Sequence, residues 1–130
     1  MNIIDHTGLS VTDLERALRF YEQALAPLDI SVVMRVTKEQ RGDYEAAGLG
    51  RNGKPSFWLS GQGKTTPHIH VAFIADDRAA VDAFHKAGLA AGGRDNGAPG
   101  IRAHYHPNYY GAFILDPEGH NIEAVCHRAE

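Results

Sequence analysis

The stretch His6-Thr7-Gly8-Leu9-Ser10-Val11-Thr12-Asp13 decides the fold, because a stretch of the same kind, His70-Val71-Ala72-Phe73-Ile74-Ala75-Asp76-Asp77, returns 64 residues later. A fixed offset that preserves residue character is the signature of an internal repeat. Both copies begin with a histidine, continue through a strand-like run and end at an aspartate. The matched positions are His6 with His70, Leu9 with Phe73, Asp13 with Asp77, Ala17 with Val81, Phe20 with Phe84 and Leu25 with Leu89.

A helix follows each copy of the repeat. Asp13 is a candidate N-cap for a helix over residues 14–25, and Asp76 or Asp77 for one over residues 78–86, with Gly88 as its C-terminal stop. Residues 92–100 contain four glycines and predict a flexible loop, and residues 61–67 predict a linker. The predicted strands are residues 3–11, 30–36, 44–48 and 56–60 in the first half, and 69–75, 90–94, 109–115 and 121–126 in the second.

This order of elements is βαβββ, repeated once. We therefore expect an α+β protein whose two modules, residues 1–62 and 66–130, form a curved mixed sheet around a cleft. A chain of 130 residues with 43% hydrophobic residues suits one compact domain, or two small halves that share a core.

Charge and cysteine content exclude several classes of partner. The net charge of −3 gives no basic patch, so neither nucleic acid nor a membrane surface is an expected partner. Cys126 is the only cysteine, which excludes an intrachain disulfide and favours a reducing, cytoplasmic compartment. The first residues do not resemble a signal peptide, and no apolar run approaches the ~18 residues of a membrane span.

Three residues far apart in the chain form a candidate metal site. His6 and His70 hold equivalent places in the repeat, and Glu123 lies in the last predicted strand. Two imidazoles and one carboxylate are a facial ligand set for a divalent ion such as Zn, Fe(II), Mn, Ni or Co, and they leave positions open for substrate. Taken singly, each residue has an ordinary alternative as a surface or core side chain.

Three motifs resemble the vicinal oxygen chelate superfamily, which contains glyoxalases, bleomycin resistance proteins and extradiol dioxygenases. Residues 6–21 are similar to its opening motif, residues 70–73 to the start of its second module, and residues 116–123 (Asp-Pro-Glu-Gly-His-Asn-Ile-Glu) to its closing turn and ligand strand. The resemblance covers nearly the whole chain. It implies a glyoxalase-like fold with His6, His70 and Glu123 as metal ligands.

Two departures from the family bear on the reaction. Glyoxalase I-type members have a fourth ligand, a glutamate in the last strand of module one, whereas residues 56–60 hold no carboxylate. Extradiol dioxygenases carry a tyrosine ten residues before the ligand glutamate, where this chain has Phe113. These departures argue against lactoylglutathione lyase chemistry and against ring cleavage, respectively.

The segment from Ala103 to Tyr110 is dense in titratable groups. His104 and Tyr105 are candidate catalytic residues beside Glu123, because an imidazole near a bound substrate can move a proton. If the segment is extended, His104 and His106 share one face. The alternative is a polar aromatic rim without a catalytic role.

Two functions follow from the resemblance. One is a metal-dependent lyase, isomerase or dioxygenase that chelates a small oxygenated substrate. The other is a metal-free protein that sequesters a drug or metabolite in the same cleft. Superfamily proteins of this size often pair their modules between subunits, so we expect a homodimer, in which His6 of one chain can join His70 and Glu123 of the other.

Overall fold

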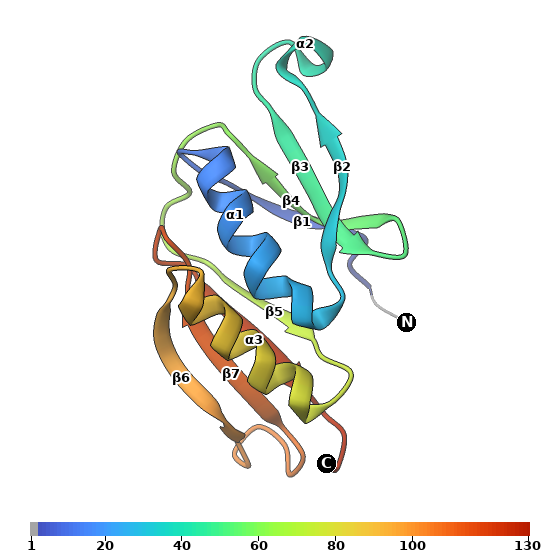
Figure 1. Ribbon diagram of the computed structural model, residues 1–130, viewed down its shortest axis with the longest axis vertical. Helices are drawn as coiled ribbons and strands as arrows, with labels where there is room; N and C mark the ends of the chain where they lie inside the picture. The colour runs from blue at the N-terminus through green and yellow to red at the C-terminus, as the bar shows by residue number, and fades with distance from the viewer. Residues whose placement is uncertain (1–2) are drawn as a thin grey trace.

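The computed structural model describes residues 3–130, so the first two residues of the predicted first module lie outside the described part of the chain. The strands form two four-stranded sheets, in the orders β1-β4-β3-β2 and β5-β8-β7-β6 (Figure 1). The first group of elements is β1 (Thr7–Ser10), α1 (Leu14–Leu25), η1 (Ala26–Leu28), β2 (Ser31–Val36), α2 (Lys38–Arg41), β3 (Ala46–Arg51) and β4 (Lys54–Ser60). The second is β5 (His70–Ile74), α3 (Arg78–Ala90), β6 (Arg94–Ile101), β7 (Tyr110–Leu115) and β8 (Asn121–Cys126).

The two sheets have the same topology. In each, the first strand pairs in parallel with the last, as β1 does with β4 and β5 with β8. The other neighbours in each sheet are antiparallel. The predicted α+β class and the repeated βαβββ plan are confirmed.

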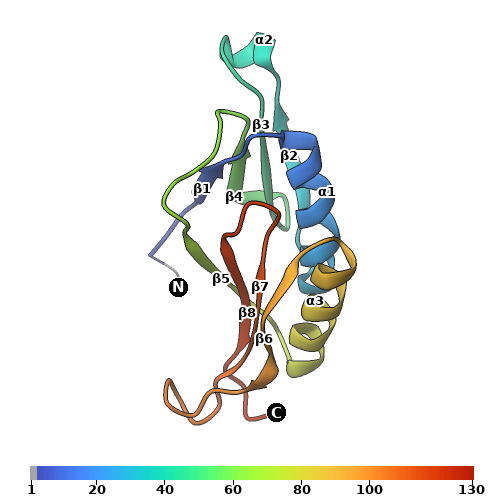
Figure 2. The same cartoon turned by 90° about the vertical axis from the view of Figure 1, so that its left-hand side faces the viewer.

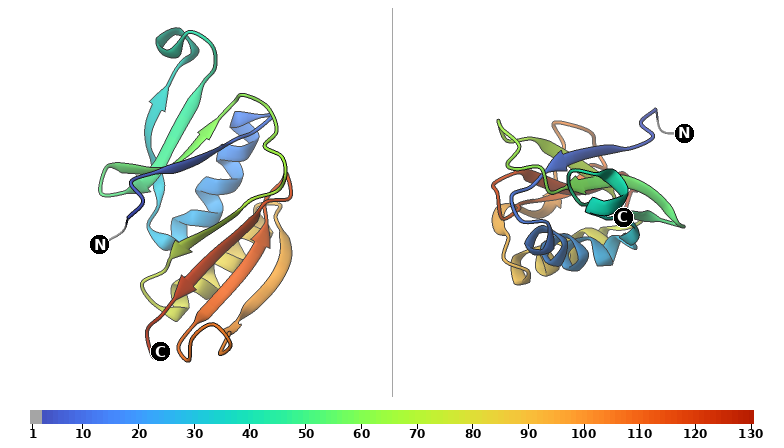
Figure 3. Two further views of the ribbon diagram at one scale, coloured as in Figure 1. Left: turned by 180° about the vertical axis from the view of Figure 1, so that it is seen from behind. Right: turned by 90° about the horizontal axis from the view of Figure 1, so that it is seen from above.

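Both long helices lie on one side of the molecule. Figure 2 shows α1 and α3 beside each other on one side, with both sheets on the other. Alternate strand residues such as Phe57 and Leu59 of β4, and Ile122 and Ala124 of β8, are buried in the core against the helices. The intervening residues lie on the opposite face of each sheet, called here the open face, which Figure 3 shows on its left with the helices behind.

The helix starts follow from the repeated aspartates. The Asp13 side chain accepts a hydrogen bond from the amide of Arg16 at 3.1 Å, and Asp77 accepts one from Ala80 at 2.8 Å. Each satisfies an amide that the first turn leaves without a partner. Helix α1 has the predicted bounds, and Asp77 rather than Asp76 caps α3.

The predicted end of the second helix is wrong. Gly88 lies inside α3, which continues to Ala90, so the predicted strand at residues 90–94 begins as helix and turn. A Cβ on Gly88 would come within 2.3 Å of Ile114 Cδ1. Gly88 therefore lets the helix approach β7 closely instead of stopping it.

The predicted flexible loop at residues 92–100 is also wrong, because most of it forms strand β6. Register shifts interrupt the pairing with β7 on both sides of Gly97, whose φ is 153°. Pro99 lacks an amide hydrogen, which an edge strand such as β6 tolerates. Glycine here marks bulges in an edge strand and not an absence of structure.

Polar contacts tie the two modules together. The buried Tyr21 of α1 donates a hydrogen bond to Asp116 of the β7–β8 turn at 2.5 Å. Burial and the neighbouring Asp116 carboxylate raise the pKa of Tyr21 well above its usual value, which keeps the phenol as the donor. The amide of Thr12 donates to Glu118 of the same turn at 2.9 Å. The turn that precedes β8 is thus anchored to the first module.

Candidate functional site

His70 and Glu123 come together on the open face of the second sheet. His70 is the first residue of β5, and Glu123 is central in β8, in register with Ala72. The neighbours Val71 and Phe73 pack against the core, so alternation places His70 on the opposite face. The strand pairing of the second module therefore builds this part of the predicted site.

The two side chains are in direct contact. His70 Nε2 lies 3.0 Å from Glu123 Oε1, and His70 Nδ1 lies 3.1 Å from the carbonyl oxygen of Asn121. A carbonyl only accepts, so Nδ1 donates to it, and the contact between Nε2 and the carboxylate then requires a second proton or a cation between these two atoms. Glu123 is 1% exposed, whereas the His70 side chain is half exposed. A buried carboxylate needs charge or hydrogen-bond partners, and this one has an imidazole that solvent still reaches.

Tyr109 is a member of the site that the sequence did not indicate. Its hydroxyl donates a hydrogen bond to Glu123 Oε2. Burial and the Glu123 carboxylate raise the pKa of Tyr109 well above its usual value. A signal was present, because Tyr109 precedes a strand in which Gly111 and Phe113 alternate with core residues, but only the register between β7 and β8 reveals which carboxylate it meets.

His6 lies with the other sheet, just before β1. Its Nδ1 is 2.7 Å from the Asp5 carboxylate, which also binds Lys54 at 2.8 Å. Among residues 3–130, no three His, Cys, Asp or Glu side chains are grouped closely enough to hold a metal ion. A single chain thus brings together two of the three predicted ligands, and the role of His6 stays a prediction.

His104 and Tyr105 lie in the loop that joins β6 to β7. This loop is not extended, since Tyr105 and His106 both donate their amide hydrogens to the Arg102 carbonyl. The rings of His104 and Tyr105 are 4.1 Å apart between centroids, and the Tyr105 ring is 5.0 Å from that of Tyr109. Tyr105 therefore reaches Glu123 only through Tyr109, and the catalytic roles of His104 and Tyr105 stay predictions.

Arg102 organises this loop instead of facing solvent freely. Its guanidinium donates to the carbonyls of Ala98, Gly100 and Gly111 at 2.7–3.2 Å. The same group lies 5.5 Å from the centre of the Phe113 ring. Three main-chain acceptors use most of its donors, which fixes the loop beside the open face.

A cavity of about 550 Å³ adjoins His70 and receives residues from both modules. Its size is within the range of small-molecule pockets. The lining is largely apolar, with Leu49, Phe57 and Phe73 among its members, and it includes Arg51, whose guanidinium donates to the Ile74 carbonyl. The cavity thus offers apolar surface next to the histidine of the His70–Glu123 pair.

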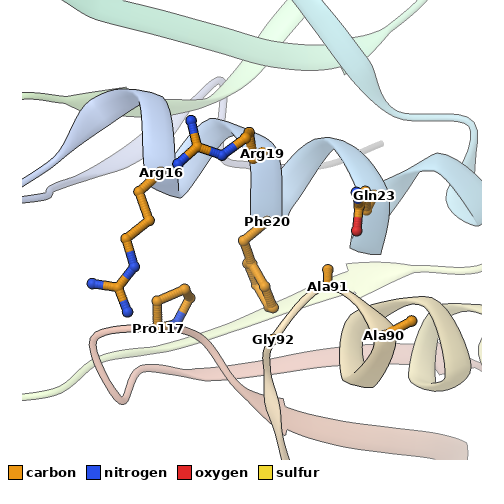
Figure 4. Close-up of a pocket in the computed structure, with 8 residues that line it drawn as sticks. All are labelled: Arg16, Arg19, Phe20, Gln23, Ala90, Ala91, Gly92 and Pro117. Carbon is orange, nitrogen blue, oxygen red and sulfur yellow. The ribbon is translucent and has the colours of Figure 1, made fainter.

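A second, smaller pocket of about 290 Å³ lies on the helix side (Figure 4). Arg16 extends past Pro117, whereas Arg19 points away from it, so the two guanidinium groups do not converge on one ligand. This pocket is separate from the open face and adds nothing to the site.

The donor atoms of the second sheet fit a divalent metal. A histidine that ligates a metal usually donates its other ring N–H to a carbonyl or carboxylate, and His70 does so to Asn121. Two donors that bind one ion at right angles, each at about 2.1 Å, lie roughly 3 Å apart. The 3.0 Å between His70 Nε2 and Glu123 Oε1 agrees with this separation.

The first sheet lacks the corresponding carboxylate. Trp58 is in register with Gly8, as Glu123 is with Ala72. In the second sheet Phe113 is in register with Glu123, and its ring lies 6.1 Å from that of His70. Of the two departures noted in the sequence, Phe113 thus lies beside the His70–Glu123 pair, whereas Trp58 lies in the other sheet.

No helix within residues 3–130 has the length and apolar character needed to cross a bilayer.

Several solved structures are similar to this one. A glyoxalase/bleomycin resistance protein from Albidiferax ferrireducens T118 is 28% identical, with a TM-score of 0.76, and the match covers 96% of this chain and 98% of that one. No protein in the curated set matches the chain.

Two further structures, at lower identity, support the fold alone. A glyoxalase/bleomycin resistance/dioxygenase domain from Frankia sp. EAN1pec is 22% identical, with a TM-score of 0.73 and coverage of 98% and 99%. Glyoxalase I from Zea mays is 24% identical with a TM-score of 0.68, and the match covers 95% of this chain but only 45% of that one. The model of the Glyoxalase/Bleomycin resistance protein/Dioxygenase superfamily matches residues 3–124, and the chain belongs to this superfamily.

Proposed function

We propose that this chain is a glyoxalase- or dioxygenase-like metalloenzyme, of the lyase, isomerase or dioxygenase type, that chelates a small oxygenated substrate on a divalent metal. The observation that carries the proposal is the contact between His70 Nε2 and the buried Glu123 carboxylate, with the opposite ring nitrogen fixed by a main-chain carbonyl. Superfamily membership and the donor chemistry support the same reading.

The third ligand in this proposal is His6 of a second copy of the chain. His6 is exposed and belongs to the first sheet, away from the His70–Glu123 pair of its own chain. Ile3, Ile4 and Ile74 are also exposed, at 100%, 65% and 54%, and all three line the cavity beside His70. A homodimer that covers these apolar side chains would bring His6 of one subunit to the His70–Glu123 pair of its partner.

Each residue has a definite part. A divalent ion of the Zn, Fe(II), Mn or Ni type supplies a Lewis acid for substrate oxygens. His70 and Glu123 hold it, and the Asn121 carbonyl keeps the His70 ring in the orientation that turns Nε2 toward the site. His104 and Tyr105, on the loop beside Tyr109, are the candidates for moving a proton at the substrate.

The test is metal content, measured by plasma mass spectrometry on untagged protein purified without chelator. We expect one ion per chain in the wild type and none in His70→Ala. His85→Ala is the matched control, because His85 Nε2 also lies 3.0 Å from a carboxylate, that of Asp95, but on helix α3. The proposal fails if wild type takes up no Zn²⁺, Mn²⁺, Fe²⁺ or Ni²⁺, or if His70→Ala keeps full occupancy.

A metal-free binding protein of the bleomycin-resistance type is the second candidate. The apolar cavity of about 550 Å³ favours it, since a sequestering protein needs such a space and no ion. In that case the His70–Glu123 contact is an ion pair like His85–Asp95, and the wild type gives no metal signal in the same measurement.

A further inference from the structure

We infer that Tyr109 is a positioning residue for Glu123. Its phenol holds Oε2, so that Oε1 is the oxygen presented, together with His70 Nε2, to a divalent ion. This inference rests on the proposed function and adds to it how the carboxylate binds. It concerns a residue that matches no part of the motifs which carry the family resemblance.

The two oxygens of Glu123 have separate partners. Oε1 faces His70 Nε2 at 3.0 Å, and Oε2 accepts the hydrogen bond from the Tyr109 hydroxyl. The carboxylate is 1% exposed, so water does not compete freely for either oxygen. Because Oε2 already has a donor, Oε1 is the oxygen that an ion beside His70 Nε2 would meet first.

Two neighbouring rings contact the Tyr109 ring. Its centroid lies 5.0 Å from that of Tyr105 and 5.1 Å from that of His127, the latter in an edge-to-face arrangement. The main chain is fixed too, since the Tyr109 carbonyl accepts from the Arg102 amide at 2.7 Å and its amide donates to the His106 carbonyl at 3.0 Å. The phenol is therefore placed by the loop before an ion arrives.

Gly111 provides the space for this hydrogen bond. A Cβ at position 111 would lie 3.2 Å from Glu123 Oε2 and 3.2 Å from Tyr109 Cε1. Those distances are tighter than ordinary van der Waals contact, so any side chain there would press on both partners. Gly111 thus leaves the space in which the Tyr109 hydroxyl reaches Glu123 Oε2.

The consequence is coordination through a single oxygen. A carboxylate that binds with both oxygens would occupy two positions around an ion, whereas one that presents only Oε1 would occupy one. The remaining positions are then available to His6 of the partner subunit and to two substrate oxygens. Tyr109 thereby keeps room for a chelated substrate.

The experiment titrates Co²⁺ into wild type, Tyr109→Phe and Tyr110→Phe, following affinity by calorimetry and coordination by visible absorption. Tyr110→Phe is the control because its hydroxyl also donates to a carboxylate, that of Asp82 at 2.6 Å, outside the site. We expect Tyr109→Phe to bind about 10- to 100-fold more weakly, the usual cost of losing an outer-shell partner, and to show an altered spectrum. Tyr110→Phe should match the wild type in both.

Wild-type affinity and spectrum in Tyr109→Phe would overturn the inference and leave the proposed function standing. No Co²⁺ binding by any of the proteins would overturn the proposed function and the inference with it. If Tyr109→Phe does not fold, Gly111→Ala provides the second variant, because it keeps the phenol and crowds Oε2. Unchanged Co²⁺ binding in folded Gly111→Ala would likewise contradict the inference.

Discussion

In the first sheet Trp58 lies between Gly8 and Gly48, whereas at the corresponding place in the second sheet Glu123 lies between Ala72 and Phe113. The backbones follow the same plan of pairing, and each sheet has a histidine at the start of its repeat. Neither glycine has room for a side chain, since a Cβ on Gly8 would lie 2.9 Å from the Trp58 carbonyl and one on Gly48 within 3.0 Å of its indole. The first sheet accommodates a large aromatic ring where the second places a buried charge.

In the proposed function, the two modules contribute different parts of the metal site. The second sheet supplies two possible donor atoms with hydrogen-bond partners that fix them, and the first offers the exposed His6. On this account a metal site needs the second sheet of one chain and the first sheet of another. The following changes either break the difference between the sheets or sharpen it.

The largest effect on metal affinity is expected from Glu123→Gln. This variant removes the carboxylate charge of the second sheet, which has no counterpart in the first. The amide keeps the shape of the carboxylate and still accepts from Tyr109, so we expect a native circular dichroism spectrum. Metal affinity should fall by at least about 100-fold, because a neutral amide is a poor partner for a divalent ion. Calorimetric titration with Zn²⁺ measures the loss, and a fall of less than threefold would remove Glu123 from the ligand set.

Trp58→Glu makes the opposite change, giving the first sheet a histidine and a carboxylate in the register of His70 and Glu123. We expect affinity for Zn²⁺ to rise roughly tenfold, about 1.4 kcal/mol, through a fourth ligand. Ser60→Glu is the control, because it adds the same charge to the same face of β4, also two residues away. An equal gain in both variants would show that charge alone, without coordination, raises the affinity.

The smallest effect concerns the feature that the two modules share. Asp13→Ala and Asp77→Ala each remove a side-chain acceptor at a helix start, and each should lower the free energy of unfolding by about 1 kcal/mol. Urea denaturation measures the free energy of unfolding of each variant. A loss confined to one of them would show that the modules contribute unequally to stability even where their sequences agree.

The sequence predicted the repeated plan well because its signals are local. Asp13 and the apolar spacing after it specify α1, and the equivalent Asp77 specifies the start of α3. The wrong predictions, the end of the second helix and the loop at residues 92–100, were both based on glycines. A glycine can end a helix, kink a strand or permit close packing, and the sequence alone does not distinguish these roles. Gly88 serves close packing against Ile114, and Gly97 lies at a bulge in β6, and only tertiary contacts distinguish these uses.

The sequence singled out two of the candidate ligands but not the side chains around them. The repeat singled out His70, and the closing motif singled out Glu123, which lie in contact. Tyr109 was missed because its hydrogen bond connects the residue before β7 to Glu123 of β8. The sequence of either strand alone does not reveal the register in which the two strands pair. Among residues 3–130, His6 is not grouped with the pair, so its part in the site stays a prediction.

The most direct test of the central claim is subunit complementation. His6→Ala and His70→Ala chains, carrying different tags, are produced together, and the heterodimer is isolated and its metal content measured against both mutant homodimers. We predict one ion per heterodimer and none in either homodimer, because only the mixed dimer pairs an intact first sheet with an intact second sheet. A folded heterodimer that holds no ion would contradict the account.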